Sequence, residues 1–513
     1  MTDASDNSPV SRPSASEPST VSGVTRRGVL DAVAVLGSIA IVGRATPLAA
    51  APAVSERSWK QLAQTLSGPL LRPDDAAFRA AARPNNLAYD DRLPAGIARC
   101  RTAEDVQAAV LWCRENEVGF VTRAGGYSYA GHSMTRGLLI DVGGLNTVAF
   151  DKQTGRVSVG AGVTHRELFA ALSRREVSVI HGRVYGIGVG GFTLGGGLGY
   201  DARLHGVGSD RLVETDIVGA DGKIRTASAK NQTDLFWACR GGGGGNFGIN
   251  TQFVLDTFAV ADITTFDITW SDRPEAVADA LLKALAKAPD RLGSKMRLRS
   301  VTPENRPEQR SVHVRLTGQL HGPREELLDI LAPVFAVGPA LKRTIRNGPY
   351  WENQRLVAEQ RAPDRYRGRS RFVAKDFDAP ALDAAFRQAR RFPGTGGEAS
   401  LKLLQTGEAI NAVRPEDTAF VHRGSRWLLM TTFSYRGSDS RRTVAAAGDW
   451  LDETYEVMLP YCGKGAFQNM SDPALDDCYE QYYGANLARL REIKAAVDPD
   501  GVFRFGQSIP GAR

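Results

Sequence analysis

Arg123-Ala-Gly-Gly-Tyr-Ser-Tyr-Ala-Gly131 and, from Gly186, Gly-Ile-Gly-Val-Gly-Gly-Phe-Thr-Leu-Gly-Gly-Gly-Leu-Gly199 are the two stretches that decide the fold of this chain. Backbone without Cβ atoms can press against a cofactor, and at positive φ it can turn several N–H groups toward one anion. A pyrophosphate can be held in this way without a dedicated lysine. The two segments therefore predict a dinucleotide-binding protein.

Length and charge limit the classes of protein that the chain can belong to. It has 513 residues, of which 42% are hydrophobic and 24% charged, enough for a large core and two or three domains. The net charge of +7 comes from 64 basic and 57 acidic residues spread along the sequence without a basic block. This pattern predicts a globular protein with a mildly basic surface and no nucleic-acid partner.

The amino terminus has the layout of an export signal. A polar leader precedes Arg26-Arg27, and an apolar run then continues through Val42 to a small-residue tract. This arrangement resembles a twin-arginine (Tat) signal. Because the run contains Asp31 and much alanine and glycine, a retained membrane anchor is not expected. We predict a signal and leader at 1–53 and a mature protein that is periplasmic or extracellular.

The five cysteines are too few for a disulfide scaffold in a chain of this length. Cys113 and Cys239 lie in apolar patterns and are predicted to be buried thiols. Cys462 and Cys478 flank a loop, and export would permit a bond between them. No Cys-x-x-Cys or paired histidine spacing indicates a metal site, so none is predicted.

Helical and strand patterns alternate around the glycine segments. A capping box at Thr102–Asp105 predicts a helix start, and a strand at 119–123 runs directly into the first glycine segment. Further elements are predicted as strands at 138–142 and 156–159, a helix at 163–172 and a hairpin at 212–227 around Asp221-Gly222.

The stretch Gly186–Gly191 also matches the Rossmann dinucleotide pattern, and Asp210 lies where a ribose-binding acid is expected. We reject that interpretation. So many glycines follow that we expect no stable helix to begin here and hold a pyrophosphate at its N-terminus. Because the glycines alternate with Ile, Val, Phe and Leu, we predict a buried segment rather than a surface loop.

Four motifs in order identify a family resemblance. Besides the two glycine segments, they are Asp234-Leu-Phe-Trp-Ala-Cys-Arg-Gly-Gly-Gly-Gly-Gly-Asn-Phe-Gly248 and Tyr482-Tyr-Gly-Ala-Asn486, with Asp498-Pro499 and 503–509 after it. Together they resemble the berberine-bridge-enzyme-like FAD-linked oxidases of the vanillyl-alcohol oxidase fold group. The resemblance covers nearly all of the chain after residue 53.

The resemblance implies an α+β fold with a two-part PCMH-type FAD-binding domain and an inserted α+β substrate domain. The expected boundaries are 54–258 for the FAD-binding domain, 259–458 for the substrate domain and 459–513 for the segment that completes the FAD-binding domain. Strand-like runs at 265–270 and 311–316 alternate with helix-like runs at 274–285 and 324–335, which favours an antiparallel sheet covered by helices. The active site is expected between the domains.

The resemblance also implies which residues contact FAD. They are Arg123, Ala124, Gly125, Gly126, Tyr127, Ser128, Tyr129, Gly188, Gly190, Gly191, Gly195, Gly196, Gly197, Gly199, Phe247, Gly248, Ile249, Tyr482 and Asn486. Tight backbone packing is the alternative for the glycines, and a core position is the alternative for Tyr482.

Two positions depart from the family. Many relatives attach the flavin through a histidine and a cysteine, where this chain has Tyr127 and Val184. Neither usual bond can form, so we expect noncovalent FAD with a lower redox potential; an O-tyrosyl bond through Tyr127 is the alternative. His132 and His181 lie out of register and are expected to be packing residues. Ile187, at the position linked to oxygen access, does not separate an oxidase from a dehydrogenase.

The usual catalytic base is also missing. Relatives carry a tyrosine where Phe467-Gln-Asn-Met-Ser-Asp472 has Met470, which cannot take a proton. Leu429 stands about where other relatives have an acid. The remaining candidates are Tyr127, Tyr482, Tyr483 and His422, although His422-Arg423 is also explained as a structural pair.

These observations predict an exported FAD-dependent oxidoreductase. It is expected to move a hydride from a C–H next to an alcohol or amine of a small molecule to flavin N5, and to pass the electrons to oxygen or another acceptor. A flavin-binding carrier without catalysis is the alternative. The run Arg361–Arg371 is predicted to be a solvated face, with contact to an acidic substrate as the alternative.

Overall fold

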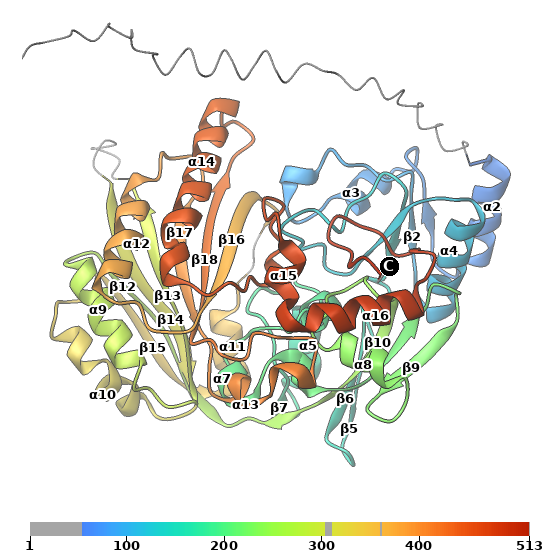
Figure 1. Cartoon of the computed structure of the whole chain (residues 1–513). Coiled ribbons are helices and arrows are strands. Elements are labelled where there is room, and N and C mark those ends of the chain that lie inside the picture. Colours follow the sequence, from blue (N-terminus) through green and yellow to red (C-terminus); the bar gives the residue numbers. More distant parts are fainter. Residues whose placement is uncertain (1–53, 303–309, 360–361, 512–513) are drawn as a thin grey trace, which may run out of the picture. The chain divides into compact units, whose positions relative to one another are not determined.

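The computed structural model describes residues 54–302, 310–359 and 362–511, and the residues from 54 onward form one compact unit (Figure 1). The predicted export signal at 1–53 lies outside the described residues. Within them, no helix has both the length and the apolar character needed to cross a membrane, and no cluster of side chains suits a metal ion.

The first sheet is small and mainly parallel. Its strand order is β1 (Leu70–Leu71), β2 (Gly96–Arg99), β4 (Leu138–Asp141) and β3 (Phe120–Arg123), with β4 parallel to both β2 and β3. Helices α2 (Glu56–Thr65), α3 (Phe78–Ala82) and α4 (Ala103–Glu115) accompany it. Because β3 ends at Arg123, the first glycine segment leaves directly from a strand end, as the sequence predicted.

The start of α4 has the predicted cap. Thr102 caps the helix by accepting from the backbone N–H of Asp105. The carboxylate of Asp105 also accepts from the backbone N–H groups of Ser67 and Arg101, both at 2.7 Å. Burial raises the pKa of Asp105, but these bonds and a backbone hydrogen bond with Thr102 outweigh burial and leave it lowered.

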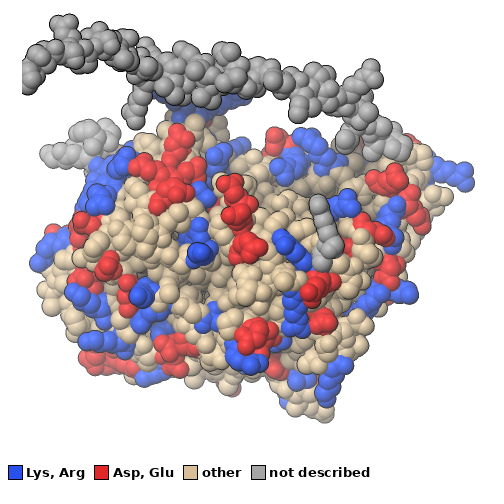
Figure 2. Space-filling model, in the orientation of Figure 1, with Lys and Arg blue, Asp and Glu red and all other residues tan. Residues whose placement is uncertain are grey.

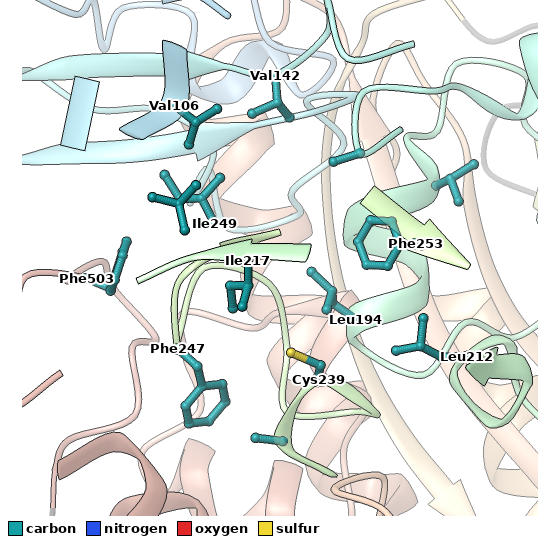
Figure 3. Packing of buried hydrophobic residues seen from close by; sticks show 14 of the residues in the cluster. Val106, Val142, Leu194, Leu212, Ile217, Cys239, Phe247, Ile249, Phe253 and Phe503 are labelled. Carbon is teal, nitrogen blue, oxygen red and sulfur yellow. The ribbon is translucent and has the colours of Figure 1, made fainter. Parts of the chain in front are cut away.

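The second sheet is antiparallel and holds the main core. Its order is β5 (Val148–Asp151), β6 (Arg156–Gly160), β10 (Ile249–Asp256), β8 (Leu212–Val218) and β9 (Ile224–Ser228), and the predicted hairpin joins β8 to β9. Helices α5 (His165–Leu172) and α8 (Thr233–Cys239) belong to this part. Side chains from both sheets meet in one apolar cluster that includes Val106, Ile217, Phe253 and Phe503 (Figure 3).

The inserted part is a seven-stranded antiparallel sheet. Its order is β15 (Lys342–Pro349), β12 (Asp262–Trp270), β14 (Ser311–Leu320), β13 (Leu292–Val301), β17 (Ala399–Gln405), β18 (Trp427–Tyr435) and β16 (Arg365–Val373). Helices α9 (Pro274–Leu285), α10 (Arg324–Phe335), α12 (Ala379–Arg391) and α14 (Arg441–Met458) cover one face (Figure 1). The predicted α+β class and the helix-covered antiparallel sheet are confirmed.

The C-terminal segment returns to the first two sheets. Helices α15 (Cys478–Tyr483) and α16 (Leu487–Val497) lie there, and α16 packs on α8. Lys494 on α16 donates to the carbonyl of Asn246 at 2.7 Å, to that of Phe503 at 3.0 Å and to the carboxylate of Asp498 at 2.6 Å. This buried ammonium therefore fixes the end of the chain to the third glycine-rich stretch.

All five cysteines are free thiols, including Cys462 and Cys478, and Cys113 and Cys239 are buried as predicted.

The arginine run 361–371 is not a solvated face throughout. Arg369 is buried and bonds Asp472 at 2.7 Å and Asp452 at 2.9 Å, because β16 carries it under the C-terminal segment.

Charges of both signs are interspersed over the molecular face drawn in Figure 2. Lysines and arginines lie beside aspartates and glutamates, with uncharged residues between them. No single-sign stripe of the kind that binds a nucleic-acid backbone is seen on that face.

Candidate active site

One cavity of about 490 Å³ lies at the junction of the three parts of the fold. Its size is that of an ordinary small-molecule or cofactor site, which spans ~300–1,000 Å³. A backbone-rich wall comes from the glycine segments, Gly243–Asn246 and Phe503–Phe505. The opposite wall is the uncovered face of the seven-stranded sheet, represented by Lys295, Arg297, Lys402, Leu404, Leu428 and Met430.

The two glycine segments touch each other at this cavity. A Cβ at Gly125 would lie 2.4 Å from the backbone nitrogen of Gly188, and one at Gly188 would lie 2.6 Å from the backbone nitrogen of Gly125. Gly126 has φ +72°, a conformation that other residues rarely adopt. By contrast, a Cβ at Gly191 would meet nothing within 4 Å. The wall is therefore bare backbone, close-packed behind and open toward the cavity.

The second segment contains a short helix that the sequence analysis did not expect. Helix α6 covers Val189–Leu194 with Gly188 as its N-cap. The prediction that no helix begins here is wrong, because Val189 and Leu194 are buried in the core and tertiary packing outweighs the low helix propensity of glycine.

The rejection of a Rossmann site still holds. The strands around α6 belong to an antiparallel sheet rather than a parallel one. Asp210, the apparent ribose partner, is bound by both terminal nitrogens of buried Arg423, at 2.6 and 2.8 Å. Its carboxylate is therefore committed to a structural ion pair.

Most of the predicted cofactor residues line this one cavity. They are Arg123, Ala124, Gly125, Gly126, Tyr127, Ser128, Tyr129, Gly188, Gly190, Gly191, Gly199, Gly248 and Ile249. The others are not on its wall: Gly195, Gly196, Gly197, Phe247, Tyr482 and Asn486. At Gly195–Gly197 an added Cβ would strike Asn469, Phe420 and Phe192, so these three glycines permit close side-chain packing.

The side chain of Arg123 holds the first segment rather than reaching into the cavity. Its guanidinium donates to the backbone carbonyls of Ala81 and Ala82 and lies 3.6 Å from the carboxylate of Asp141. The strand end and α3 are thereby tied together. Tyr127 packs over Gly186, where an added Cβ would lie 2.4 Å from the Tyr127 hydroxyl.

Two of the four catalytic candidates, Tyr482 and His422, are not on the cavity wall. The hydroxyl of Tyr482 accepts from the N–H of Asp472 at 2.9 Å and from Gln507 at 2.8 Å, and burial raises its pKa. His422 stacks on Phe372 with ring centroids 4.1 Å apart, and burial lowers its pKa to about 3. Tyr127 and Tyr483 are the two candidates that lie on the wall.

The segment Phe467–Ser471 does reach the cavity, as the resemblance implied. Met470 therefore stands at the site without a group that can take a proton. Leu429, which stands about where other relatives have an acid, is not on the cavity wall. Leu429 points into the core under the helices, whereas Leu428 and Met430 line the cavity, because side chains alternate between the two faces of a strand.

Sequence reasoning missed a polar group on the sheet side. Tyr200, the residue after the second glycine segment, lines the cavity. Its hydroxyl lies 3.1 Å from a terminal nitrogen of Arg183 and 2.8 Å from the hydroxyl of Thr317. The guanidinium of Arg183 also lies 5.0 Å from the Tyr200 ring centroid. A tyrosine ending a glycine run was a visible signal, but its partners come from distant parts of the sequence.

A buried hydrogen-bond network fixes the backbone next to Tyr200. The carboxylate of Asp201 contacts His321 at 2.6 Å, Gln319 at 2.7 Å and the hydroxyl of Tyr350 at 2.8 Å. Burial raises the pKa of Asp201, but these partners and the nearby histidines outweigh burial and leave it lowered. His181, also on the cavity wall, bonds Tyr350 at 2.8 Å.

The cavity fits a flavin dinucleotide. A Cβ at Gly191 would enter open space, and Nε2 of His132, another residue of that wall, is buried without a hydrogen-bond partner among the described residues. A buried polar atom without a protein partner calls for a water or a polar ligand. The fold and the cavity thus place the protein in the dinucleotide-binding class, with the seven-stranded sheet facing the glycine wall.

Comparison with known proteins identifies the class more closely. The FAD binding domain family matches residues 94–228, and the family described as berberine and berberine like matches residues 466–510. The FAD-linked oxidoreductase YvdP of Bacillus subtilis is 31% identical over 461 residues, covering 87% of this chain and 99% of that protein. The chain belongs to the berberine-bridge-enzyme-like FAD-linked oxidoreductases.

Solved structures agree on the fold. BBE-like 1 of Physcomitrella patens matches with a TM-score of 0.79 at 24% identity, covering 88% of this chain and 99% of that one. The glucooligosaccharide oxidase of Acremonium strictum matches with a TM-score of 0.76 at 23% identity, covering 86% and 97%. Membership of the FAD-linked oxidoreductase family makes this protein an enzyme with FAD as cofactor, rather than a carrier.

Proposed function

We propose that this enzyme is exported, binds FAD noncovalently and takes a hydride from a C–H next to an alcohol or amine of a small molecule. Oxygen or another acceptor then removes the electrons. The bound cofactor supplies the two-electron oxidation, with N5 of its isoalloxazine ring as hydride acceptor. The leader at 1–53 supports export.

The observation that carries the noncovalent proposal is the position of two side chains. Tyr127 and Val184 both lie on the cavity wall. The solved glucooligosaccharide oxidase is described with 6-S-cysteinyl, 8α-N1-histidyl FAD. A valine has no group that forms such a bond, and Tyr127 is not the histidine that the other bond requires.

Different parts of the chain bind the cofactor and the substrate. The glycine segments hold the cofactor by backbone contact, and Arg123 braces the first of them through Ala81, Ala82 and Asp141. The sheet wall presents charged and apolar side chains to the substrate. The relatives named as saccharide oxidases favour an alcohol or hemiacetal of a sugar over an amine.

Acid precipitation of the mature holoprotein tests the mode of FAD binding. We expect the yellow colour to stay in the supernatant, because no covalent bond retains it. A yellow pellet would contradict the proposal, and loss of that colour from the pellet in Tyr127→Phe would assign the bond to Tyr127.

Anaerobic bleaching of the flavin tests the reaction. The holoprotein is mixed with cellobiose, glucose, benzyl alcohol and benzylamine in turn, and the visible flavin absorbance is followed. Bleaching by a sugar or alcohol is expected, whereas no bleaching by any of the four contradicts the proposed reaction. Admission of air to the bleached protein then separates an oxidase, which regains its colour, from a dehydrogenase.

A further inference from the structure

Several ionisable cavity groups are poorly suited to accept a proton from a substrate. Tyr483 lines the cavity but donates its hydroxyl to the carbonyl of Gly242 at 3.0 Å, and burial raises its pKa. The two ring nitrogens of His181 lie within hydrogen-bond distance of Tyr350 and of the Gly182 carbonyl. The Tyr483 proton is thus held by a carbonyl, and both ring nitrogens of His181 already have partners.

Tyr200 has the opposite environment. Arg183 donates a hydrogen bond to its hydroxyl oxygen, and the hydroxyl of Thr317 can donate a second one. A phenolate at this position would accept both bonds, and charged acceptors form stronger hydrogen bonds than neutral ones. The local geometry therefore stabilises the deprotonated tyrosine.

The surrounding charges act in the same direction. Burial raises the pKa of Tyr200, but Lys295, Arg183 and the hydrogen bonds outweigh burial, so its pKa is lowered from the ordinary value of 10.0. Attraction to Tyr200 raises the pKa of Lys295, whereas burial and the neighbouring Arg297 and Arg183 leave it lowered overall. Glu359, the Asp267–Arg315 pair and the buried carboxylate of Asp201 are further charges close to these groups.

The position of Tyr200 is tightly fixed. A Cβ on Gly293 of β13 would lie 2.0 Å from the Tyr200 carbonyl oxygen, so the strand backbone packs directly against it. On its other side, the Asp201 network with His321, Gln319 and Tyr350 holds the following residue. Tyr200 is therefore held in place on the cavity wall, between the glycine wall and the sheet wall.

We propose that Tyr200 is the catalytic base, with Arg183 and Lys295 as positioning residues that keep its oxygen ready to accept a proton. The proposal rests on the hydride transfer proposed above. The substrate O–H bond breaks and its proton moves to the phenolate oxygen of deprotonated Tyr200, which becomes a neutral hydroxyl, while a C=O bond forms. The hydrogen of the adjacent C–H leaves with its electron pair, so oxidation of the alcohol is balanced by reduction of the FAD cofactor.

Absorbance titration tests the ionisation of Tyr200 without turnover. The chain has 13 tyrosines, so tyrosinate absorbance of the wild-type holoprotein is compared with that of Tyr200→Phe at equal FAD content. We expect one tyrosine equivalent to ionise below the ordinary pKa of 10.0 in the wild type and to be missing in the variant. In Lys295→Met it should move to higher pH, and Lys295→Arg should restore it.

Tyr479→Phe is the matched control. Tyr479 lies off the cavity and donates to the carbonyl of Ser508 at 3.0 Å. Its removal should leave the low-pH ionisation unchanged. Equal titration curves for the wild type and Tyr200→Phe below that pH would overturn the proposal.

Rapid mixing under anaerobic conditions tests the catalytic role. With the alcohol that bleaches the wild type fastest, Tyr200→Phe should reduce its flavin ~100-fold to 10,000-fold more slowly, as expected for loss of a general base. FAD affinity should stay the same. Thr317→Val keeps the tyrosine and should shift the pH profile upward, which guards against a folding defect in Tyr200→Phe.

Two failures remain distinguishable. If none of the four compounds bleaches the wild type, the proposed reaction fails while the titration still decides the ionisation of Tyr200. If the wild type is bleached and Tyr200→Phe is bleached equally fast, the reaction stands and Tyr200 is not its base.

Discussion

The two walls of the cavity differ in what they present to it: one presents backbone and the other presents side chains. The glycine wall offers backbone, and two of its segments approach so closely that a single Cβ at Gly125 would collide with Gly188. The sheet wall offers individual side chains, including Lys295, Lys402 and Met430. A cofactor shared by many relatives can be held by backbone, whereas a particular substrate must be distinguished by side chains.

The largest expected effect is on the glycine wall. Gly125→Ala places a Cβ 2.4 Å from the Gly188 nitrogen and 2.7 Å from the Gly186 carbonyl oxygen. Overpacking of this kind costs about 1–3 kcal/mol, so we expect a lower melting temperature and FAD binding weakened by ~10-fold to 100-fold. Calorimetry and flavin fluorescence measure the two effects.

Gly191→Ala is the matched control on the same wall. Its Cβ would meet nothing within 4 Å, so the melting temperature of the FAD-free protein should not fall. An equal fall in both variants would show that close packing at Gly125 is not the cause.

The next largest effect is expected on stability, from the buried Asp201 network that fixes the backbone next to Tyr200. Asp201 is 2% exposed and accepts from three partners, so Asp201→Asn should cost about 2 kcal/mol, the scale of a hydrogen bond to a charged group. Because the folded pKa is lowered, the stabilisation is present above the unfolded pKa of about 3.9 and is lost as pH falls through the folded value. Denaturant unfolding at pH 7 and at acid pH tests this. A difference from wild type that persists undiminished in strong acid would contradict it.

A smaller effect is expected on the pH dependence of stability, and it tests whether His422 is a buried neutral histidine. His422 has a folded pKa of about 3 because it is buried, and its unfolded pKa is about 6.5. Its stabilising contribution is therefore present above that value and is lost as pH falls toward the folded one, by up to about 1.4 kcal/mol per pH unit. His422→Gln should flatten the dependence of unfolding free energy on pH between 6.5 and 5. An unchanged slope would show that His422 is protonated in the folded protein.

The smallest effect should come from the sheet wall. Lys402 donates to the hydroxyl of Thr432 at 2.7 Å and faces the cavity. Lys402→Met should leave FAD affinity within about twofold, a difference below ~0.5 kcal/mol, and change the KM of the substrate. A large loss of FAD affinity in this variant would show that the sheet wall also binds the cofactor, against the proposed difference between the two walls.

Local sequence patterns predicted much of the fold. The helix bounds at Pro274–Leu285 and Arg324–Phe335 and the hairpin around Gly222 match the structure, because apolar periodicity and turn residues act locally. The start of α6 at Val189 was missed, because burial in the core outweighed the weak propensity of glycine.

The sequence predicted the part of the candidate site that is built from backbone. It did not predict the part that depends on contacts between side chains distant in the sequence. The first glycine segment lines the cavity as expected. Tyr200 was overlooked because its partners, Arg183 and Thr317, come from another loop and from β14. Leu429 points into the core rather than to the cavity, since a shift of one on a strand exchanges its two faces.

The return of the C-terminal segment has a consequence for how the protein is made. Lys494 bonds the carbonyl of Asn246, and the backbone of Ile509 bonds the Asn246 side chain at 2.9 Å. The cavity wall at Gly243–Asn246 therefore lacks its final partners until synthesis has passed Ile509. A nascent chain can complete the seven-stranded sheet first, and this wall of the cavity is completed only after Ile509 has left the ribosome.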